Sequence, residues 1–300
     1  MSVDISHEQG NVSRSEVESL ASLLEDPDVY VHKEARKRLF ELGEKAIPLL
    51  DEYCCGSRDT RLQRRIQGII RQISLCSLEQ DFIRFLENGV ETLSNLEKGV
   101  FILSRFESPT IRTEIYEHQL DEIADKIIPL ISGLTTAEAC KITLHHIFDT
   151  EQFRPAGKEY FDPANSYFHL VLQRREGIPI SLAMVALFVG RRLGLPFEGV
   201  NMPMHFLLRY QAGRENEFVY VDPFNNGAEV RIEQCAYFLK KCGIRPNKHH
   251  FEAAHPADML ARALRNFINS YEKRQEHHRV KDFKKLLELL EISQSGWNFR

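Results

Sequence analysis

The segment that most constrains the fold is GIPISLAMVALFVGRRLGLP, residues 177–196, which is nearly all apolar and is bounded by Gly-Ile-Pro and Gly-Leu-Pro. A helix that is apolar on every side must be buried. A transmembrane helix needs about 20 apolar residues, and this run is shorter. The segment therefore predicts a helix at the centre of a soluble domain.

Composition limits the classes of function. The chain has 43% hydrophobic and 27% charged residues, as soluble globular proteins do. Its formal net charge of −4 and pI near 6.3 argue against a nucleic-acid partner. The polar N-terminal residues contain no signal-peptide core, and no apolar run reaches membrane-spanning length. We therefore expect a cytoplasmic protein with neither nucleic acid nor membrane as partner.

Neither the cysteines nor the histidines show a metal-binding pattern. The 6 cysteines form no CxxC pair, so we expect reduced, buried thiols. The His pairs at 145–146, 249–250 and 277–278 do not have the spacing of zinc ligands. We expect no metal and no cofactor.

The N-terminal part is predicted to be helical and repetitive, after a disordered tail at residues 1–15. When the segment after Asp28 is aligned with the segment after Asp59, apolar residues at a spacing of four occupy matching positions in both. Residues 16–76 thus resemble a pair of HEAT repeats. The equivalent apolar pairs are Val31 with Leu62, Ala35 with Ile66, and Leu39 with Ile70.

Residues 77–255 are predicted to form the main domain. Its helical lead-in, residues 77–150, contains a capping box from Thr135 to Glu138. Its core, residues 153–232, contains the buried helix and three strand-like runs, FEGVNM, HFLLRY and FVYVDPF. Residues 256–292 carry two amphipathic helices that resemble a tetratricopeptide-like hairpin. The fold class expected from this order is α+β.

A histidine and an aspartate lie on the two strands of a predicted hairpin. A turn centred near Gly213–Arg214 would place His205 directly opposite Asp222 on one face of the sheet. A carboxylate there can fix the tautomer of the imidazole and raise its basicity. Alternatively, His205 is a structural histidine that bridges Asp222 to the start of the buried helix. The prediction depends on register, since a slip of one residue would put the two side chains on opposite faces.

Four motifs in order, DPxNS, RRxGIPISL, PxHFLxR and DPFNxG, resemble the transglutaminase-like domain of SirB-type bacterial proteins. The resemblance runs from about Phe153 to Leu290. It implies a papain-like core, in which a Cys at the start of the buried helix is the nucleophile and His and Asp follow on two strands.

The resemblance implies that His205 and Asp222 occupy the His and Asp positions of this triad. The nucleophile position falls at Pro179 or Ile180, where there is no cysteine. Ser181 is the only nucleophile-capable side chain nearby. Cys140 or Cys235 could substitute only if the fold brought one of them to His205.

Several other residues are candidates for the cleft. Asp162, Asn165 and Ser166 could line it beside His205, or could instead form an Asx turn and cap the following helix, with Asn165 or Ser166 as N-cap. The remaining cleft candidates are Pro179 and Asn201.

Three arginines allow two interpretations as well. An acidic substrate or structural ion pairs would equally explain Arg174, Arg175 and Arg209.

Two functions remain open. The first is a non-catalytic interaction or regulatory module that binds a protein or peptide through its helical repeats or its cleft. The second is an amide or ester hydrolase or acyl transferase with Ser181 as nucleophile, His205 as base and Asp222 orienting the imidazole. A nucleophile within about 4 Å of the imidazole would favour the enzyme.

Overall fold

The computed structural model describes residues 12–157, 159–213 and 217–296, and its contacts divide the chain into two compact units, Met1–Asp81 and Phe82–Arg300. Most of the predicted disordered tail, residues 1–11, lies outside the described residues. The first helix, α1, begins at Arg14, inside the range predicted as tail.

In the first unit, two aspartates start helices in the same way. Asp28 accepts a hydrogen bond from the backbone N–H of Tyr30, and Asp59 accepts from those of Arg61 and Leu62. Each carboxylate thereby satisfies N–H groups that have no partner within the helix. The predicted equivalence of the two aspartates thus corresponds to two helix caps. The helical elements are α1 (Arg14–Ser22), η1 (Leu23–Glu25), α2 (Val29–Leu42), η2 (Gly43–Ala46), α3 (Ile47–Gly56) and α4 (Thr60–Glu87), the last of which continues into the second unit.

The buried face of α4 differs from the predicted spacing of four. Leu62 and Ile66 are buried as expected, but Ile70 is only half-buried, and Ile69 and Ile73 lie in the core instead. Four residues advance 40° beyond one full turn of a helix with 3.6 residues per turn, so a row with a constant spacing of four drifts off the face. Alternating steps of four and three keep the apolar stripe directed at the core.

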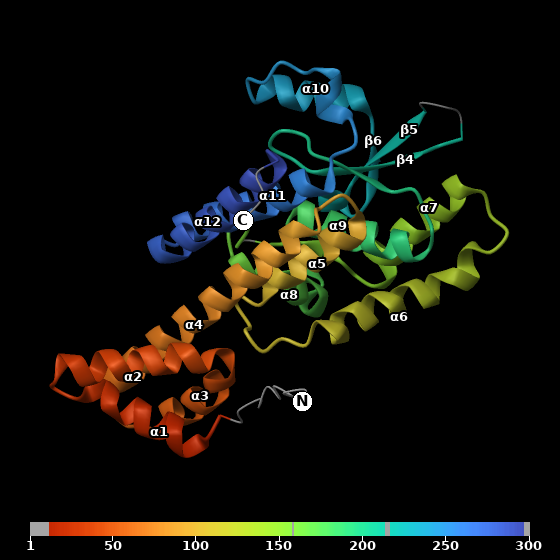
Figure 1. The fold of residues 1–300 in the computed structure, drawn as a ribbon. Helices are drawn as coiled ribbons and strands as arrows, with labels where there is room; N and C mark the ends of the chain where they lie inside the picture. The colour runs from red at the N-terminus through yellow and green to blue at the C-terminus, as the bar shows by residue number, and fades with distance from the viewer. Residues whose placement is uncertain (1–11, 158, 214–216, 297–300) are drawn as a thin grey trace, which may run out of the picture. The chain divides into compact units, whose positions relative to one another are not determined.

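The second unit is built around a four-stranded antiparallel sheet in the order β3-β4-β5-β6. On one side α10 packs through Cys235 and Leu239 against Leu207 of β4. Helices α7 and α9 contact β4 as well, and Figure 1 shows α10 above the strands and α9 below them. This confirms the predicted α+β fold, although β6 and α10 were not predicted. The strands are β1 (Arg154–Pro155), β2 (Glu176–Gly177), β3 (Glu198–Val200), β4 (Leu207–Gln211), β5 (Phe218–Asp222) and β6 (Ala228–Val230).

The helices of this unit include the predicted capping box at the start of α7, where Thr135 and Glu138 bond each other's backbone N–H groups. The helices are α5 (Leu93–Ser104), α6 (Thr113–Ile131), α7 (Thr136–His145), α8 (Phe168–Arg174), α9 (Pro179–Arg192), α10 (Ile232–Lys241), α11 (Pro256–Lys273) and α12 (His277–Gln294). The shorter turns are η3, a π-helix (His146–Thr150), and the 3-10 turns η4 (Pro163–Asn165), η5 (Pro223–Asn225) and η6 (Lys248–Phe251).

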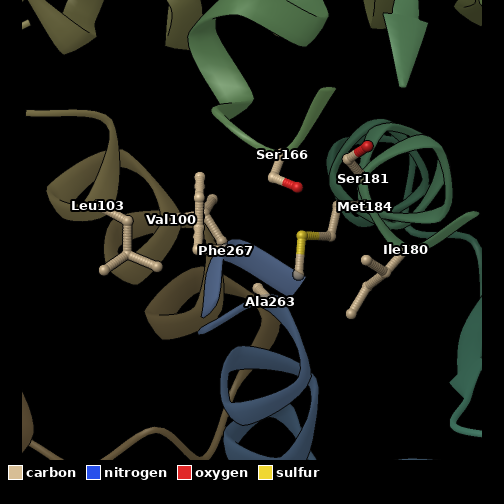
Figure 2. A pocket seen from close by; sticks show the side chains of 8 residues that line it. All are labelled: Val100, Leu103, Ser166, Ile180, Ser181, Met184, Ala263 and Phe267. Carbon is tan, nitrogen blue, oxygen red and sulfur yellow. The ribbon is translucent and has the colours of Figure 1, made fainter. Parts of the chain in front are cut away.

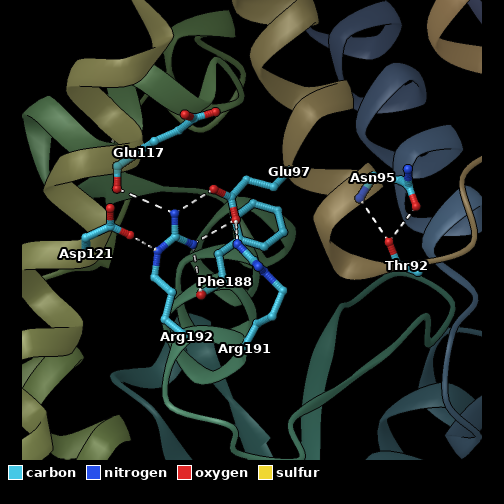
Figure 3. Close-up of polar contacts among 8 residues, drawn as sticks. All are labelled: Thr92, Asn95, Glu97, Glu117, Asp121, Phe188, Arg191 and Arg192. Carbon is cyan, nitrogen blue, oxygen red and sulfur yellow. Dashed lines mark hydrogen bonds and ion pairs between the residues drawn. The ribbon is translucent and has the colours of Figure 1, made fainter.

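Helix α9 is the central helix that its apolar sequence predicts, because every residue from Pro179 to Gly190 is buried. Its first turn borders a small cavity beside α5 and α11 (Figure 2). At its other end, Arg191 and Arg192 reach the buried carboxylate of Glu97 on α5 (Figure 3). The helix is therefore fixed by packing along its length and by ion pairs at its C-terminus.

The last two helices, α11 and α12, form a hairpin within the second unit. The rings of Phe267 and Phe283 stack with centroids 4.5 Å apart. The hydroxyl of Tyr271 bonds that of Tyr167, just before α8, at 2.7 Å. The hairpin is thus packed onto the rest of this unit. No helix in the described part of the chain is both long and apolar enough to cross a bilayer.

Candidate functional site

The histidine and the aspartate that the sequence singles out are in contact. The Nε2 atom of His205 lies 2.8 Å from Oδ1 of Asp222, and each side chain is 19% exposed. The same Oδ1 accepts the backbone N–H of Phe224 at 2.9 Å, so Asp222 also caps η5. Because Nε2 faces the carboxylate, Nδ1 is the nitrogen left for any further partner.

The pair forms in a register that differs from the predicted one. Direct pairing of His205 with Asp222 would place Leu208 opposite Val219, but Leu208 pairs with Val221. His205 lies ahead of β4, which begins at Leu207, and reaches Asp222 diagonally. A displacement of two residues leaves each side chain on its original face of the sheet, so the contact survives.

The pair lies on the face of the sheet that α10 covers. The ring of Phe238, from α10, is 6.4 Å from that of His205, and the ring of Phe224 is 6.5 Å from it. Cys235, also from α10, is near enough to Asp222 for the carboxylate to affect its thiol. From the sequence, Cys235 was a possible neighbour of His205, but Phe224, Phe238 and the helix α10 itself were not predicted. The apolar spacing of Ile232, Cys235, Ala236 and Leu239 indicates an amphipathic helix there.

Ser181 is engaged elsewhere. Its hydroxyl accepts the backbone N–H of Ile178 at 3.0 Å and donates to the carbonyl of Asn165 at 2.8 Å, with the carbonyl of Ile178 at 3.1 Å. The residue is 3% exposed. A Cβ atom on Gly177 would lie 2.5 Å from this oxygen, so the hydroxyl fills the bend before α9. The Ser181 hydroxyl thus stabilises the start of α9 through bonds to backbone atoms. It forms no hydrogen bond with His205.

The cavity at this helix start is too small for a substrate. Its volume is about 10 Å³, at the lower limit of what can hold one water molecule. Ser166, Ser181, Met184 and Phe267 are among its lining residues, and His205 is not (Figure 2). The hydroxyl of Ser166 is buried there without a hydrogen-bond partner.

The other cleft candidates have structural contacts. Asp162 accepts the N–H of Ala164 in the predicted Asx turn. The predicted N-cap of α8 was wrong: the cap position is held by Tyr167, without a side-chain bond, because Asn165 ends the preceding turn η4 and Ser166 is the C-cap of that turn. The side-chain amide of Asn165 bonds the carbonyls of the segment before η4.

The remaining candidates also have assigned contacts. Asn201 accepts from Arg262 at 2.7 Å, and Pro179 is buried in the first turn of α9. The three arginines of uncertain role form ion pairs: Arg174 with Asp162, Arg175 with Glu151, and Arg209 with Glu198.

The two cysteines that could replace a missing nucleophile are poorly reactive. Burial raises the pKa of the Cys140 thiol to about 12. Burial, followed by the charge of Asp222, raises the pKa of the Cys235 thiol. Near neutral pH both remain thiols, whereas the nucleophilic form is the thiolate. Within the described ranges no group of three or more His, Cys, Asp or Glu side chains is arranged to hold a metal ion.

Comparison with known proteins places this arrangement in a family. F-box only protein 21 of Mus musculus is 38% identical over 99 residues, which are 31% of this chain and 16% of that protein. A UPF0162 protein of Xylella fastidiosa is 30% identical over 145 residues, 48% of this chain and 50% of the relative. A UPF0162 protein of Vibrio cholerae is 44% identical over 66 residues, 22% of this chain and 24% of the relative.

The chain thus spans half or less of the length of these relatives. No solved structure matches it. The sequence model of the transglutaminase-like superfamily matches residues 114–265, which include α9, the sheet and the His205–Asp222 pair. The chain therefore belongs to the transglutaminase-like superfamily.

Proposed function

We propose that this protein is a non-catalytic member of the superfamily, a module that binds a protein or peptide partner. The observation that carries the proposal is that the Ser181 hydroxyl is inaccessible and already bonded. It is buried and bonded to backbone atoms at the helix start, where the family resemblance expects a reactive side chain. A serine nucleophile needs its base within hydrogen-bond reach and an accessible oxygen.

The His205–Asp222 pair has a structural role in this proposal. Asp222 accepts from both His205 and the backbone of Phe224, so it holds the lead-in to β4 against η5. A buried or half-buried carboxylate with two donors is satisfied without any catalytic partner. The pair thereby stabilises the end of the sheet next to α10.

We also propose the narrower relationships that the motifs suggest. The order DPxNS, RRxGIPISL, PxHFLxR and DPFNxG supports kinship with SirB-type proteins. The equivalent caps at Asp28 and Asp59 support HEAT-like repeats in the first unit. The α11–α12 hairpin supports a tetratricopeptide-like end. Helical repeats of these kinds bury only one face on their neighbours and often offer the other to proteins.

One specific observation favours the alternative, an amide or ester hydrolase or acyl transferase. The His205–Asp222 contact has the geometry of a base and its orienting acid, and it leaves Nδ1 for a nucleophile. That enzyme would require Ser181 to leave its backbone partners and reach the imidazole.

A fluorophosphonate probe, which labels activated serines, separates the two functions. We expect no labelling of the wild-type chain, because the Ser181 hydroxyl is buried and already bonded. Labelling that disappears in both Ser181→Ala and His205→Ala would reject the proposal in favour of the hydrolase. Iodoacetamide under the same conditions tests Cys235, which we expect to react slowly.

The structural role of Ser181 has its own readout. Ser181→Ala removes this partner from the N–H of Ile178 and the carbonyl of Asn165, which keep a longer bond of 3.4 Å to each other. We therefore expect it to lower the free energy of unfolding by about 0.5–1.5 kcal/mol. The imidazole NMR signals of His205 should be unchanged in this variant. They should move in Asp222→Asn, which serves as the positive control.

A further inference from the structure

Five aromatic rings adjoin one another in a series of contacts that includes His205. The centroid distances are 5.2 Å from Phe161 to Tyr160, 5.8 Å from Tyr160 to Phe224, 6.5 Å from Phe224 to His205 and 6.4 Å from His205 to Phe238. The rings come from the segment before η4, from η5, from the lead-in to β4 and from α10. These five residues are called the aromatic row below.

Three rings of the aromatic row are exposed, whereas Phe224 and His205 are half-buried. Tyr160, Phe161 and Phe238 are 39%, 45% and 41% exposed. Next to His205 the chain places Met204, which is 69% exposed and has a left-handed φ of 66°. Isolated exposed apolar residues are ordinary, but adjoining ones mark binding surfaces. A non-glycine residue held at positive φ with an exposed apolar side chain is a further sign of a functional surface.

Unneutralised lysines lie at both ends of the aromatic row. The Nζ atom of Lys273 is 5.5 Å from the ring centre of Phe161. At the other end, Lys241 lies one turn after Phe238 on α10, with its Nζ atom 4.9 Å from the ring centre of Tyr237, whereas Lys240 faces the opposite side of the helix. All three lysines are exposed. None of the three forms an ion pair with another residue in the ranges 12–157, 159–213 and 217–296.

The carboxylates in contact with the row are already paired. Asp162 contacts Arg174 at 3.3 Å and Arg274 at 3.5 Å, and Asp222 contacts His205. Two exposed acids lie near the row in sequence: Glu159 precedes Tyr160, and Glu233 is in the first turn of α10, five residues before Phe238. With Lys240 and Glu233 on the far side of α10, the charges beside the row that have no ion-pair partner among the described residues are those of Lys273, Lys241 and Glu159. They sum to one positive charge, which favours an acidic partner.

We propose that the aromatic row binds an extended segment of a partner protein in which apolar side chains are flanked by acidic residues. This proposal rests on the non-catalytic binding function and adds where and what the module binds. Side chains on one side of an extended chain recur about every 7 Å, close to the spacing of the rings. Apolar side chains of the segment pack on the ring faces, and its acidic residues pair with Lys273 at one end and with Lys241 at the other.

Selection from a library of random 12-residue peptides on the immobilised full chain tests the proposal. We expect selected peptides to be enriched in Asp and Glu beside apolar residues. A synthetic peptide of the selected consensus, labelled with fluorescein, should bind the wild-type chain in an anisotropy titration. Its affinity should fall at least tenfold in Tyr160→Ala/Phe238→Ala and severalfold in Lys241→Glu, and should weaken as salt rises.

A matched control tests whether the loss of affinity is specific to the aromatic row. Tyr30→Ala removes an aromatic ring that is 71% exposed in the first unit, and it should leave the affinity unchanged. The substituted rings are exposed, so the variants should fold, and circular dichroism verifies this before binding is measured. Vesicles of phosphatidylserine and phosphatidylcholine test the same surface against an anionic membrane.

The failure of this inference can be told apart from the failure of the proposed function. Peptides that bind with the same affinity to the aromatic and lysine variants would overturn the inference and leave a binding module with another surface. An absence of selected peptides, or a consensus that is basic, would also overturn it. Binding to the vesicles alone, lost in the same variants, would replace the peptide by a membrane surface. Covalent turnover of the consensus peptide would instead reject the non-catalytic function.

Discussion

His169 is a buried titratable side chain that takes no part in the site. It is 3% exposed, and its ring lies 5.7 Å from that of Tyr116 and 6.0 Å from that of Tyr167. Its Nδ1 atom is buried without a hydrogen-bond partner. Burial disfavours the charged imidazolium and lowers the pKa of His169 to about 4.

We expect this histidine to make the second unit less stable in mild acid. Between the folded pKa of about 4 and the ordinary value near 6.5, the unfolded chain binds a proton that the folded chain does not, so stability falls as the pH is lowered. The loss from pH 7 to pH 5 should be about 2 kcal/mol. Urea unfolding at the two pH values should show this loss in the wild type and not in His169→Phe.

An exposed histidine provides the control for that measurement. His118, on α6, has a side chain that is 72% exposed, and His118→Gln should keep the pH dependence of the wild type. If His169→Phe lost as much stability as the wild type between the two pH values, another group would be responsible.

At the scale of elements, the buried charge cluster at the C-terminal end of α9 connects three helices. Glu97 of α5 has a side chain that is 5% exposed and contacts Arg191 at 3.0 Å and Arg192 at 2.8 Å. Arg192 also contacts Asp121 of α6 at 2.6 Å (Figure 3). The backbone carbonyls at the end of a helix favour cations, so two arginines are well placed there. The cluster fixes the helix whose first turn contains Ser181.

Replacing the Glu97 carboxylate should therefore destabilise the second unit. We expect Glu97→Gln to lower the free energy of unfolding by about 3 kcal/mol, because it leaves the largely buried guanidinium of Arg192 with less compensating charge. Chemical denaturation of the second unit measures the loss. Glu291→Gln makes the same chemical change in a half-exposed pair with Arg265 and should cost less than about 1 kcal/mol. Equal effects of the two substitutions would contradict a special role for the buried cluster.

At the scale of the whole molecule, the chain has two compact units, each with its own apolar core. In the first, Leu39 is fully buried among the helices α1 to α4. In the second, Phe188 is fully buried on α9 and contacts Phe168 of α8 edge-on at 5.2 Å. Separate cores allow a substitution to loosen one unit while the other keeps its packing.

Hydrogen exchange read by mass spectrometry should show this separation. Leu39→Ala removes core volume, so we expect it to destabilise the first unit by about 2–5 kcal/mol and to speed exchange in α1, α2 and α3. Exchange in α9 and β4 should not change. Phe188→Ala should give the reverse pattern. Faster exchange in both units after either substitution would mean that the cores unfold together.

Local sequence was sufficient for the features that depend on local chemistry. The run from Ile178 to Gly190 has no polar side, so its burial follows from composition alone. The capping box at Thr135 follows from two side chains three residues apart. The contact of His205 with Asp222 was foreseen because the period of two in a strand fixes the face of a side chain.

Other features depend on segments that are distant in sequence, and only the tertiary structure decided them. The register differs from the predicted one by two residues, because it is set by the length of the β4–β5 connection and by the packing of the whole sheet. Ser181 bonds the carbonyl of Asn165, which is 16 residues away in sequence. No sequence motif predicts a contact between these two residues. Phe238 reaches His205 because α10 folds over the sheet. Sequence periodicity thus determined that α9 is buried and that His205 and Asp222 share a face, although it wrongly placed Ile70 on the buried face of α4. Chain closure and packing decided which side chains meet, because those contacts depend on the path of the intervening chain.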